Sequence, residues 1–329
     1  MPNLPMVLAT NALHPDGDAL LAPHARLVVA PDTSATTLKA LARDADGVIV
    51  RAKLPDDFFD HTPRMKGAVR HGVGLDFIPV EAATAKGIAV ANLPGSNTQS
   101  VVEYVFGALM HLRRPVSHAD ATLRAKGWNA ARPLAENFAE IGGSTLGVVG
   151  VGTIGKRIAT IAQAGFGMRV LGASRTTGKM PSGVEEASLD ELFARSDAIV
   201  LSCAMTPETK GLANARLIGR MKRSAVLINV SRGPVVETAA LLLALRQGTI
   251  AGAALDVHDV QPLAPDHAAY SAPNLLLTPH IAAITATSSR VMSLGSVEEM
   301  LRILRGDDPV NLANPGYKKH RVSAMKIAP

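Results

Sequence analysis

Cysteine, aromatic residues and long apolar runs are scarce in this sequence. The single cysteine, Cys203, rules out an internal disulfide framework and gives no spacing of metal ligands. Aromatic residues make up only 3% of the chain, so its core must be largely aliphatic. No apolar run reaches the roughly 18 residues that span a bilayer, and residues 1–10 show no signal-peptide pattern. We therefore expect a cytoplasmic protein with no metal site and no membrane partner.

The charge of the chain does not indicate a nucleic-acid partner. A net charge of +6 would suit one, but the basic residues are scattered along the sequence. The only dense group, at residues 318–321, is typical of a solvated tail. The excess positive charge can instead attract an anionic substrate or cofactor.

The most informative motif is a glycine fingerprint, Gly-Val-Gly-Thr-Ile-Gly, at residues 150–155. It lies between a strand-like apolar run, Leu146–Val149, and a helix-like stretch, Lys156–Ala164. In this setting glycines let backbone amides approach a pyrophosphate at the helix N-terminus. We expect a dinucleotide to bind the loop through Gly150, Gly152, Thr153, Ile154 and Gly155.

The segment from residue 146 onward has the pattern of a doubly wound parallel sheet. Short, continuously apolar runs alternate with helix signals, as expected for strands that are covered on both faces. The runs are Leu146–Val149, Met168–Ala173, Ala198–Ser202, Ala225–Val230, Ala251–Asp256 and Leu275–Thr278.

The first hundred residues repeat this alternation on a smaller scale, and a helix-like stretch, Thr285–Arg305, follows the last strand. We expect that stretch to return to the first domain. The prediction is an α/β protein of two Rossmann-like doubly wound domains, discontinuous in sequence, with a cleft between them. Residues 101–287 form the dinucleotide-binding domain, and residues 1–100 plus 288–329 form a flavodoxin-like substrate domain.

Three polar segments follow strands in the second half, at residues 229–233, 256–262 and 278–282. The carboxyl ends of parallel strands meet at one edge of the sheet, so we expect these segments on the same side as the glycine loop. An arginine there, Arg232, can bind a carboxylate through two hydrogen bonds. A histidine there, His280, can transfer a proton.

In order and spacing these motifs resemble those of the D-2-hydroxyacid dehydrogenases. The resemblance covers nearly the whole chain, and it implies hydride transfer between a nicotinamide cofactor and C2 of a small D-2-hydroxyacid or 2-ketoacid. Substrates of the glyoxylate, hydroxypyruvate or phosphoglycerate type are implied. The matching segments are His71–Asp76, Gly150–Gly155, Asn229–Gly233, Ala254–Val257 and Thr278–Ile281.

The resemblance also implies roles for individual residues. Arg232 binds the substrate, His280 is the acid/base, and Gln261 accompanies it. From the first domain, the substrate is held by the backbone amides of Val73 and Gly74 and the side chains of Arg51 and Asn97. The remaining cofactor-binding residues are Ser174, Arg175, Cys203, Val230, Ser231 and Asp256. The resemblance further implies a homodimer, with residues 101–123 as a natural contact.

One departure from the family concerns Gln261, which stands where a glutamate is usual. A carboxylate would stabilise a protonated imidazole and raise its pKa, whereas a neutral amide only orients the ring. We therefore expect ketoacid reduction to fall off at a lower pH than in the glutamate enzymes. Formate dehydrogenases, a branch of the same family, are similar to this chain at Gln261-Pro262. An enzyme of that kind is the second interpretation.

A second departure concerns the cofactor. An NAD-preferring site carries an acidic residue about 20 residues past the glycines, but this chain has Ser174-Arg175-Thr176-Thr177, and its next carboxylate is Glu185. An arginine flanked by hydroxyls suits a 2′-phosphate, which favours NADP over NAD. In the alternative, Arg175 stacks on the adenine of NAD.

Two further alternatives remain open at this stage. A nucleotide-sensing binding protein similar to the co-repressor relatives of the family could retain Arg232 and His280 without catalysis. His71, Arg70 and Lys53 could contact a phosphate on the substrate, so a phosphoglycerate-type substrate is an alternative.

Overall fold

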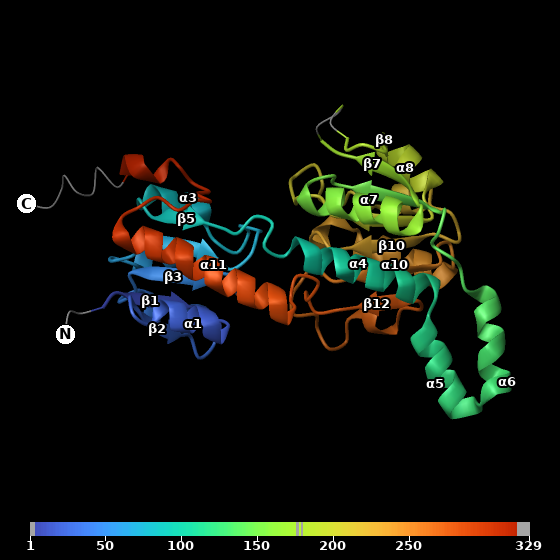
Figure 1. Cartoon of the computed structure of the whole chain (residues 1–329), viewed down its shortest axis with the longest axis horizontal. Coiled ribbons are helices and arrows are strands. Elements are labelled where there is room, and N and C mark those ends of the chain that lie inside the picture. Colours follow the sequence, from blue (N-terminus) through green and yellow to red (C-terminus); the bar gives the residue numbers. More distant parts are fainter. Residues whose placement is uncertain (1–3, 176–177, 179, 321–329) are drawn as a thin grey trace, which may run out of the picture. The chain divides into compact units, whose positions relative to one another are not determined.

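The chain divides into two compact units, each built around its own parallel sheet (Figure 1). The structure is a computed structural model that describes residues 4–175, 178 and 180–320, so Thr176, Thr177 and Arg321 lie outside it. Unit 1 comprises Met1–Asn97 and Ile284–Pro329, and unit 2 comprises Thr98–Ala283. The predicted boundaries, at residues 101 and 287, lie a few residues further along the chain. The two-sheet α/β fold class is confirmed, and the cleft stays a prediction.

Unit 1 has a five-stranded parallel sheet with the order β2-β1-β3-β4-β5, which is that of flavodoxin-like folds. Its strands are β1 (Met6–Ala9), β2 (Arg26–Val29), β3 (Gly47–Val50), β4 (Gly67–Arg70) and β5 (Ala89–Ala91). Its helices are α1 (Pro15–Leu21), α2 (Ala35–Ala42), α3 (Val80–Ala85), α11 (Ala286–Arg305) and the 3-10 turn η1 (Phe58–His61).

Helix α11 covers one face of the unit 1 sheet, although it comes from the far end of the sequence. It packs against β3, β4 and α1. At the crossing with α1, a Cβ on Gly17 would lie 2.9 Å from the Cβ of Ser293, so only glycine allows this close approach. Residues 15–18 read Pro-Asp-Gly-Asp, a poor helix sequence, which is why the sequence did not predict α1.

Unit 2 has a seven-stranded parallel sheet with the order β12-β11-β10-β9-β6-β7-β8. Its strands are β6 (Thr145–Val149), β7 (Arg169–Ala173), β8 (Val184–Glu186), β9 (Ala198–Leu201), β10 (Val226–Asn229), β11 (Gly252–Leu255) and β12 (Leu275–Leu277). Its helices are α4 (Thr98–Arg113), α5 (Val116–Lys126), α6 (Trp128–Ala131), α7 (Thr153–Phe166), α8 (Leu189–Arg195), α9 (Ala215–Ile218) and α10 (Thr238–Gln247). Its 3-10 turns are η2 (Arg132–Asn137), η3 (Gly233–Val235) and η4 (Ala268–Ser271).

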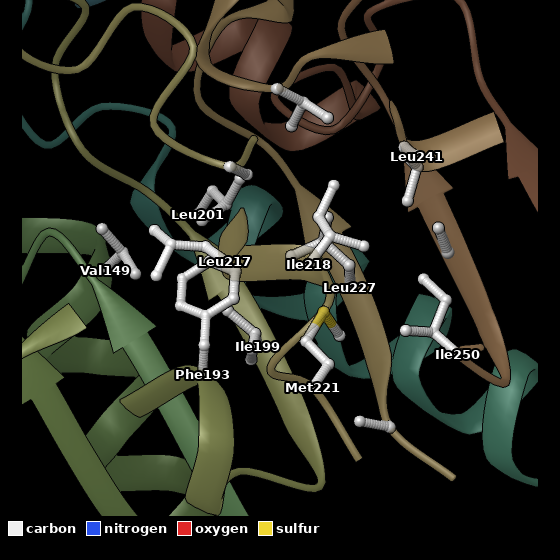
Figure 2. Close-up of a cluster of buried hydrophobic side chains, with 14 of the residues drawn as sticks. Val149, Phe193, Ile199, Leu201, Leu217, Ile218, Met221, Leu227, Leu241 and Ile250 are labelled. Atoms are coloured by element: carbon white, nitrogen blue, oxygen red, sulfur yellow. The ribbon is translucent and has the colours of Figure 1, made fainter. Parts of the chain in front are cut away.

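Both faces of the unit 2 sheet are buried, which explains why its strands read as continuous apolar runs. Neighbouring residues on one strand, such as Val148 and Val149, enter different hydrophobic clusters. One cluster also contains side chains of α4 and α7, and the other those of α8, α9 and α10. Figure 2 shows the second of these, where Phe193 and Leu217 lie close to Ile199 of the sheet.

The sequence predicted six strands for the second domain, and the structure has a seventh, β8, at the sheet edge. Of its three residues only Val184 is buried. A single buried position leaves no apolar run to detect, because the hydrogen bonds to β7 define this strand instead.

Helices α5 and α6 project away from the body of unit 2 (Figure 1). No residue of α5 is buried, and Val116 and Trp128 are 65% and 64% exposed. In the part of the chain that the structure describes, no helix has the length and apolar character to cross a membrane.

Substituting Gly155 should destabilise unit 2. An alanine Cβ there would lie 2.2 Å from the carbonyl oxygen of Gly150, so the glycine turn or α7 must shift, at a cost of about 1–3 kcal/mol. We expect Gly155→Ala to lower the free energy of unfolding measured in urea. Gly165→Ala is the control on the same helix, because its nearest neighbour is 4.0 Å away, and it should be neutral or stabilising. Equal stability of the two variants would contradict this account.

Candidate functional site

The glycine loop between β6 and α7 has the geometry of a phosphate-binding turn. Gly150 has φ +93°, and a Cβ on it would lie 2.5 Å from the backbone of Cys203. Gly152, by contrast, faces open space, since no atom of the described residues would lie within 4 Å of a Cβ there. No side chain caps the N-terminus of α7, so the amides of Thr153 and Ile154 remain directed at whatever binds there. These residues fit the pyrophosphate of a dinucleotide.

Cys203 and Ser231 lie together at the ends of β9 and β10. The backbone of Cys203 packs directly on Gly150. Burial raises the pKa of the Cys203 thiol, and a hydrogen bond with Ser231 opposes that effect. The thiol therefore stays protonated and acts as a small packing group beside the glycine loop. Val230 is half-buried and packs against the hydrophobic cluster that contains α7.

Ser174 and Arg175 follow β7 directly, and both are exposed. A cavity of about 300 Å³ lies at this edge of the sheet. It is lined by Ala173, Ser174, Glu186, Ala187, Ser188 and Leu189. The structure thus places an acidic residue, Glu186, in the lining of the same cavity as Ser174. The sequence did not indicate this, because the two residues are brought together by the pairing of β7 with β8.

The carboxylate of Asp256, at the end of β11, holds the segment that carries His280. Asp256 is only 2% exposed. Its Oδ1 accepts hydrogen bonds from Thr278 Oγ1 (2.7 Å) and the Ile281 amide (2.8 Å), and its Oδ2 accepts one from the Ala282 amide (2.9 Å). Its main-chain oxygen accepts from the His280 amide at 2.8 Å. Asp256 therefore has a structural task, whereas its predicted contact with the cofactor stays a prediction.

Thr278 also connects this carboxylate to helix α4. Its hydroxyl lies 2.6 Å from the hydroxyl of Tyr104. Since Thr278 donates its proton to Asp256, Tyr104 must be the donor in the second bond. Burial raises the pKa of Tyr104 to about 12, so this donor is retained across the working pH range. No sequence pattern indicated Tyr104, which lies 174 residues away from its partner.

His280 occupies an unusual backbone conformation and is paired with Gln261. Its φ of +59° lies in the left-handed region, which is uncommon for a residue with a side chain. Its Nδ1 lies 3.0 Å from Gln261 Oε1. An amide oxygen can only accept, so Nδ1 carries the proton. A proton exchanged with a substrate must therefore pass through Nε2.

Arg232 is held next to the Gln261 segment by backbone packing. Asn229 Nδ2 donates to the Arg232 carbonyl at 2.9 Å, and Arg232 Nη1 donates to the Ser231 carbonyl at 2.7 Å. A Cβ on the next residue, Gly233, would lie 2.0 Å from the carbonyl carbon of His258. Only glycine permits this approach, which joins the Arg232 loop to the segment that leads to Gln261.

In unit 1, the loop at residues 71–74 directs its carbonyl groups toward the scaffold. The donors are Arg70 for the carbonyls of His71 and Gly74, Leu93 for Gly72, and Asn92 for Val73, at distances of 2.6–3.1 Å. Among the described residues, the amides of Val73 and Gly74 have no acceptor. Two adjacent amides of this kind are suited to a carboxylate, as the resemblance implied.

The other two predicted residues of unit 1 differ in how they are held. Thr10 Oγ1 accepts hydrogen bonds from the amides of Arg51 and Ala52 at 2.8 and 2.9 Å. The Arg51 guanidinium donates to the carbonyl of Ala12, and partial burial lowers its pKa. Asn97 Oδ1 is buried and, within the described part of the chain, has no hydrogen-bond partner.

His71 and Arg70 do not offer a phosphate site. His71 is 4% exposed, and burial together with the charge of Arg51 lowers its pKa to about 3. Its Nε2 lies 2.9 Å from Ser293 Oγ of α11. The Arg70 guanidinium donates to backbone carbonyls and lies 4.5 Å from the Phe77 ring centroid. Of the three residues suggested for a phosphate, only Lys53 is exposed.

Removing the charge of Asp256 should loosen the His280 turn. In Asp256→Asn one acceptor becomes an NH₂ group that faces a buried donor, at a cost of about 1–3 kcal/mol. We expect a lower free energy of unfolding, measured in urea, together with a reduced kcat. Asp266→Asn, at an exposed carboxylate of the same unit, should change neither. An Asp256→Asn protein with wild-type stability and kcat would contradict the assigned role.

The chain matches known proteins over most of its length. Residues 106–282 match the NAD binding domain of D-isomer specific 2-hydroxyacid dehydrogenases. A glyoxylate reductase of Aeropyrum pernix is 35% identical over 294 residues, which cover 87% of this chain and 88% of that protein.

Solved structures agree with this match. A protein from Thermus thermophilus is 34% identical, with a TM-score of 0.85 over 94% of this chain and 99% of that one. An NADPH-dependent glyoxylate/hydroxypyruvate reductase from Sinorhizobium meliloti, solved with NADP and malonate, is 29% identical, with a TM-score of 0.83 over 95% of this chain and 98% of that one. The chain therefore belongs to the D-isomer specific 2-hydroxyacid dehydrogenase family and is an NAD(P)-dependent oxidoreductase, as its motifs predicted.

Proposed function

We propose that this enzyme reduces small 2-ketoacids of the glyoxylate or hydroxypyruvate type, with NADPH preferred over NADH. The observation that carries the proposal is the His280–Gln261 pair, in which Nδ1 is held at 3.0 Å and Nε2 is the nitrogen that can exchange a proton. The similarity to the glyoxylate reductase of A. pernix and to the reductase of S. meliloti supports the substrate class.

The residues of the chain divide the reaction between binding and proton transfer. A bound nicotinamide cofactor supplies the hydride for C2 of the ketoacid. Arg232 binds the carboxylate and stabilises the negative charge that develops on the carbonyl oxygen. His280 donates the proton from Nε2 to that oxygen, and Gln261 keeps the ring in orientation through Nδ1. The amides of Val73 and Gly74, with Arg51 and Asn97, are the proposed carboxylate anchors of unit 1.

The preference for NADPH rests on Ser174 and Arg175. A hydroxyl and a guanidinium at the end of β7 can both bond a 2′-phosphate, and this end of the strand lacks the acidic residue that would bind the ribose hydroxyls of NADH. The reductase of S. meliloti is described as NADPH-dependent and was solved with NADP, which supports the same choice.

The proposed assembly is a cytoplasmic homodimer. The α5–α6 segment exposes Val116, Leu123 and Trp128, and α5 buries no side chain within its own unit. Apolar side chains on a projecting helix are stabilised when a partner covers them, and a second copy is the partner that the family implies. Val101 is buried inside unit 2, so the exposed part of residues 101–123 supplies this contact.

The first test is the oxidation of NADPH and NADH, followed by absorbance, with glyoxylate, hydroxypyruvate, pyruvate and phosphohydroxypyruvate. We expect glyoxylate and hydroxypyruvate to be reduced fastest, with NADPH as the cofactor. Phosphohydroxypyruvate should be reduced slowly, because His71 and Arg70 are engaged within unit 1. His280→Ala should lower kcat by about 10²–10⁴, and His24→Ala, at an exposed histidine, should not. Failure of all four ketoacids with both cofactors would contradict the proposal and make formate oxidation the next assay.

Placing a carboxylate beside His280 should move the pH dependence. Reduction needs the protonated imidazole, which a glutamate stabilises. In Gln261→Glu the alkaline limb of kcat/KM for ketoacid reduction should therefore move to higher pH, by about one pH unit. Gln247→Glu adds the same charge at an exposed position of unit 2 and is the control. An unchanged profile, or an equal shift in both variants, would show that residue 261 does not set the proton affinity of the site.

A further inference from the structure

We propose that Glu186 is a second determinant of cofactor choice and acts against the 2′-phosphate that Arg175 attracts. This inference rests on the proposed preference of the site for NADPH. It starts from the cavity at the edge of the unit 2 sheet, where Glu186 and Ser174 are both lining residues.

The pairing of the two edge strands puts Glu186 in this place. Strand β8 is parallel to β7, with Glu186 opposite Gly172, and the Ala187 amide donates to the Gly172 carbonyl at 3.0 Å. The carboxyl ends of both strands therefore lie at the same sheet edge. A group bound at Ser174 therefore shares its cavity with Glu186.

The carboxylate is also tied to the backbone that follows Arg175. Glu186 Oε2 accepts a hydrogen bond from the Gly178 amide at 2.9 Å. This bond holds the negative charge at residue 178, three positions after Arg175 in the sequence. Among the described residues, Glu186 takes part in no ion pair.

The adjacent residue, Glu185, differs in this respect. Successive side chains of a strand point to opposite faces, and the Glu185 carboxylate forms an ion pair with Arg195 of α8 at 2.7 Å. It is absent from the cavity lining. The two glutamates therefore have the same chemistry and neighbouring positions but differ in access to the cavity.

The electrostatic consequence follows from the charge of the ligand. A 2′-phosphate carries close to two negative charges, so a carboxylate at the same cavity weakens its binding, whereas the uncharged ribose hydroxyls of NADH are little affected. Arg175 favours NADPH and Glu186 reduces that preference. The enzyme should therefore bind both cofactors, and its preference for NADPH over NADH should be smaller than Arg175 alone would produce.

The test is the equilibrium binding of NADPH and NADH to the whole protein, measured by isothermal titration calorimetry. Glu186→Gln keeps an oxygen that can accept from Gly178 and removes only the charge. We expect Kd for NADPH to fall about three- to tenfold, with Kd for NADH within about twofold of wild type, and the gain should shrink in 0.5 M salt because the site is exposed.

Glu185→Gln is the matched control and should leave both constants within about twofold of wild type. An unchanged or raised Kd for NADPH in Glu186→Gln, an equal gain for NADH, or an equal gain in Glu185→Gln would each overturn the inference. Ketoacid reduction is measured separately on the same proteins. A protein that reduces no ketoacid but shows these binding differences refutes the proposed function alone, and one that binds neither cofactor refutes both.

Discussion

The conformation of the His280 turn depends on the buried carboxylate of Asp256. Three donors converge on its two oxygens, and they come from a hydroxyl and two amides of the segment that contains His280. A left-handed residue costs about 1 kcal/mol or more, and these charge-assisted bonds offset that cost. Because the carboxylate is fixed at the end of β11, the sheet determines the position of the imidazole. Gln261 then needs to supply only one more hydrogen bond.

Loops that follow strands of the unit 2 sheet are joined by contacts between backbones. Gly150 lies against Cys203 and Gly233 lies against His258, at separations that no side chain would fit. Contacts of this kind contain no rotatable side chain, so they fix the loops more firmly than packed side chains would. In unit 1, the Leu93 amide and the Asn92 side chain bind the carbonyls of Gly72 and Val73, so the amides of Val73 and Gly74 in the same peptide units point the opposite way.

Much of this arrangement could be predicted from the sequence, because the polar groups follow continuous apolar runs. The strand-end position of Arg232 and His280 and the glycine loop were predicted on that basis. The position of Glu186 could not be predicted, because its strand has only one buried residue and is defined by its pairing with β7. The buried, neutral state of His71 could not be predicted either, because it depends on contact with Ser293 of α11, 222 residues away in the sequence. Local patterns predict elements well, and they predict poorly the groups that only tertiary packing brings together.

The place of α11 in the sequence affects the order in which the two units can be completed during synthesis. The strands of unit 1 are made first, but α11, which covers one face of their sheet, is made only after the whole of unit 2. Until then Ile49, Val69 and the other residues of that face lack the helix side chains with which they form a core. Unit 2 is continuous and can fold as it emerges, since domains generally fold as units during synthesis. Unit 1 therefore begins to emerge before unit 2 but is completed after it.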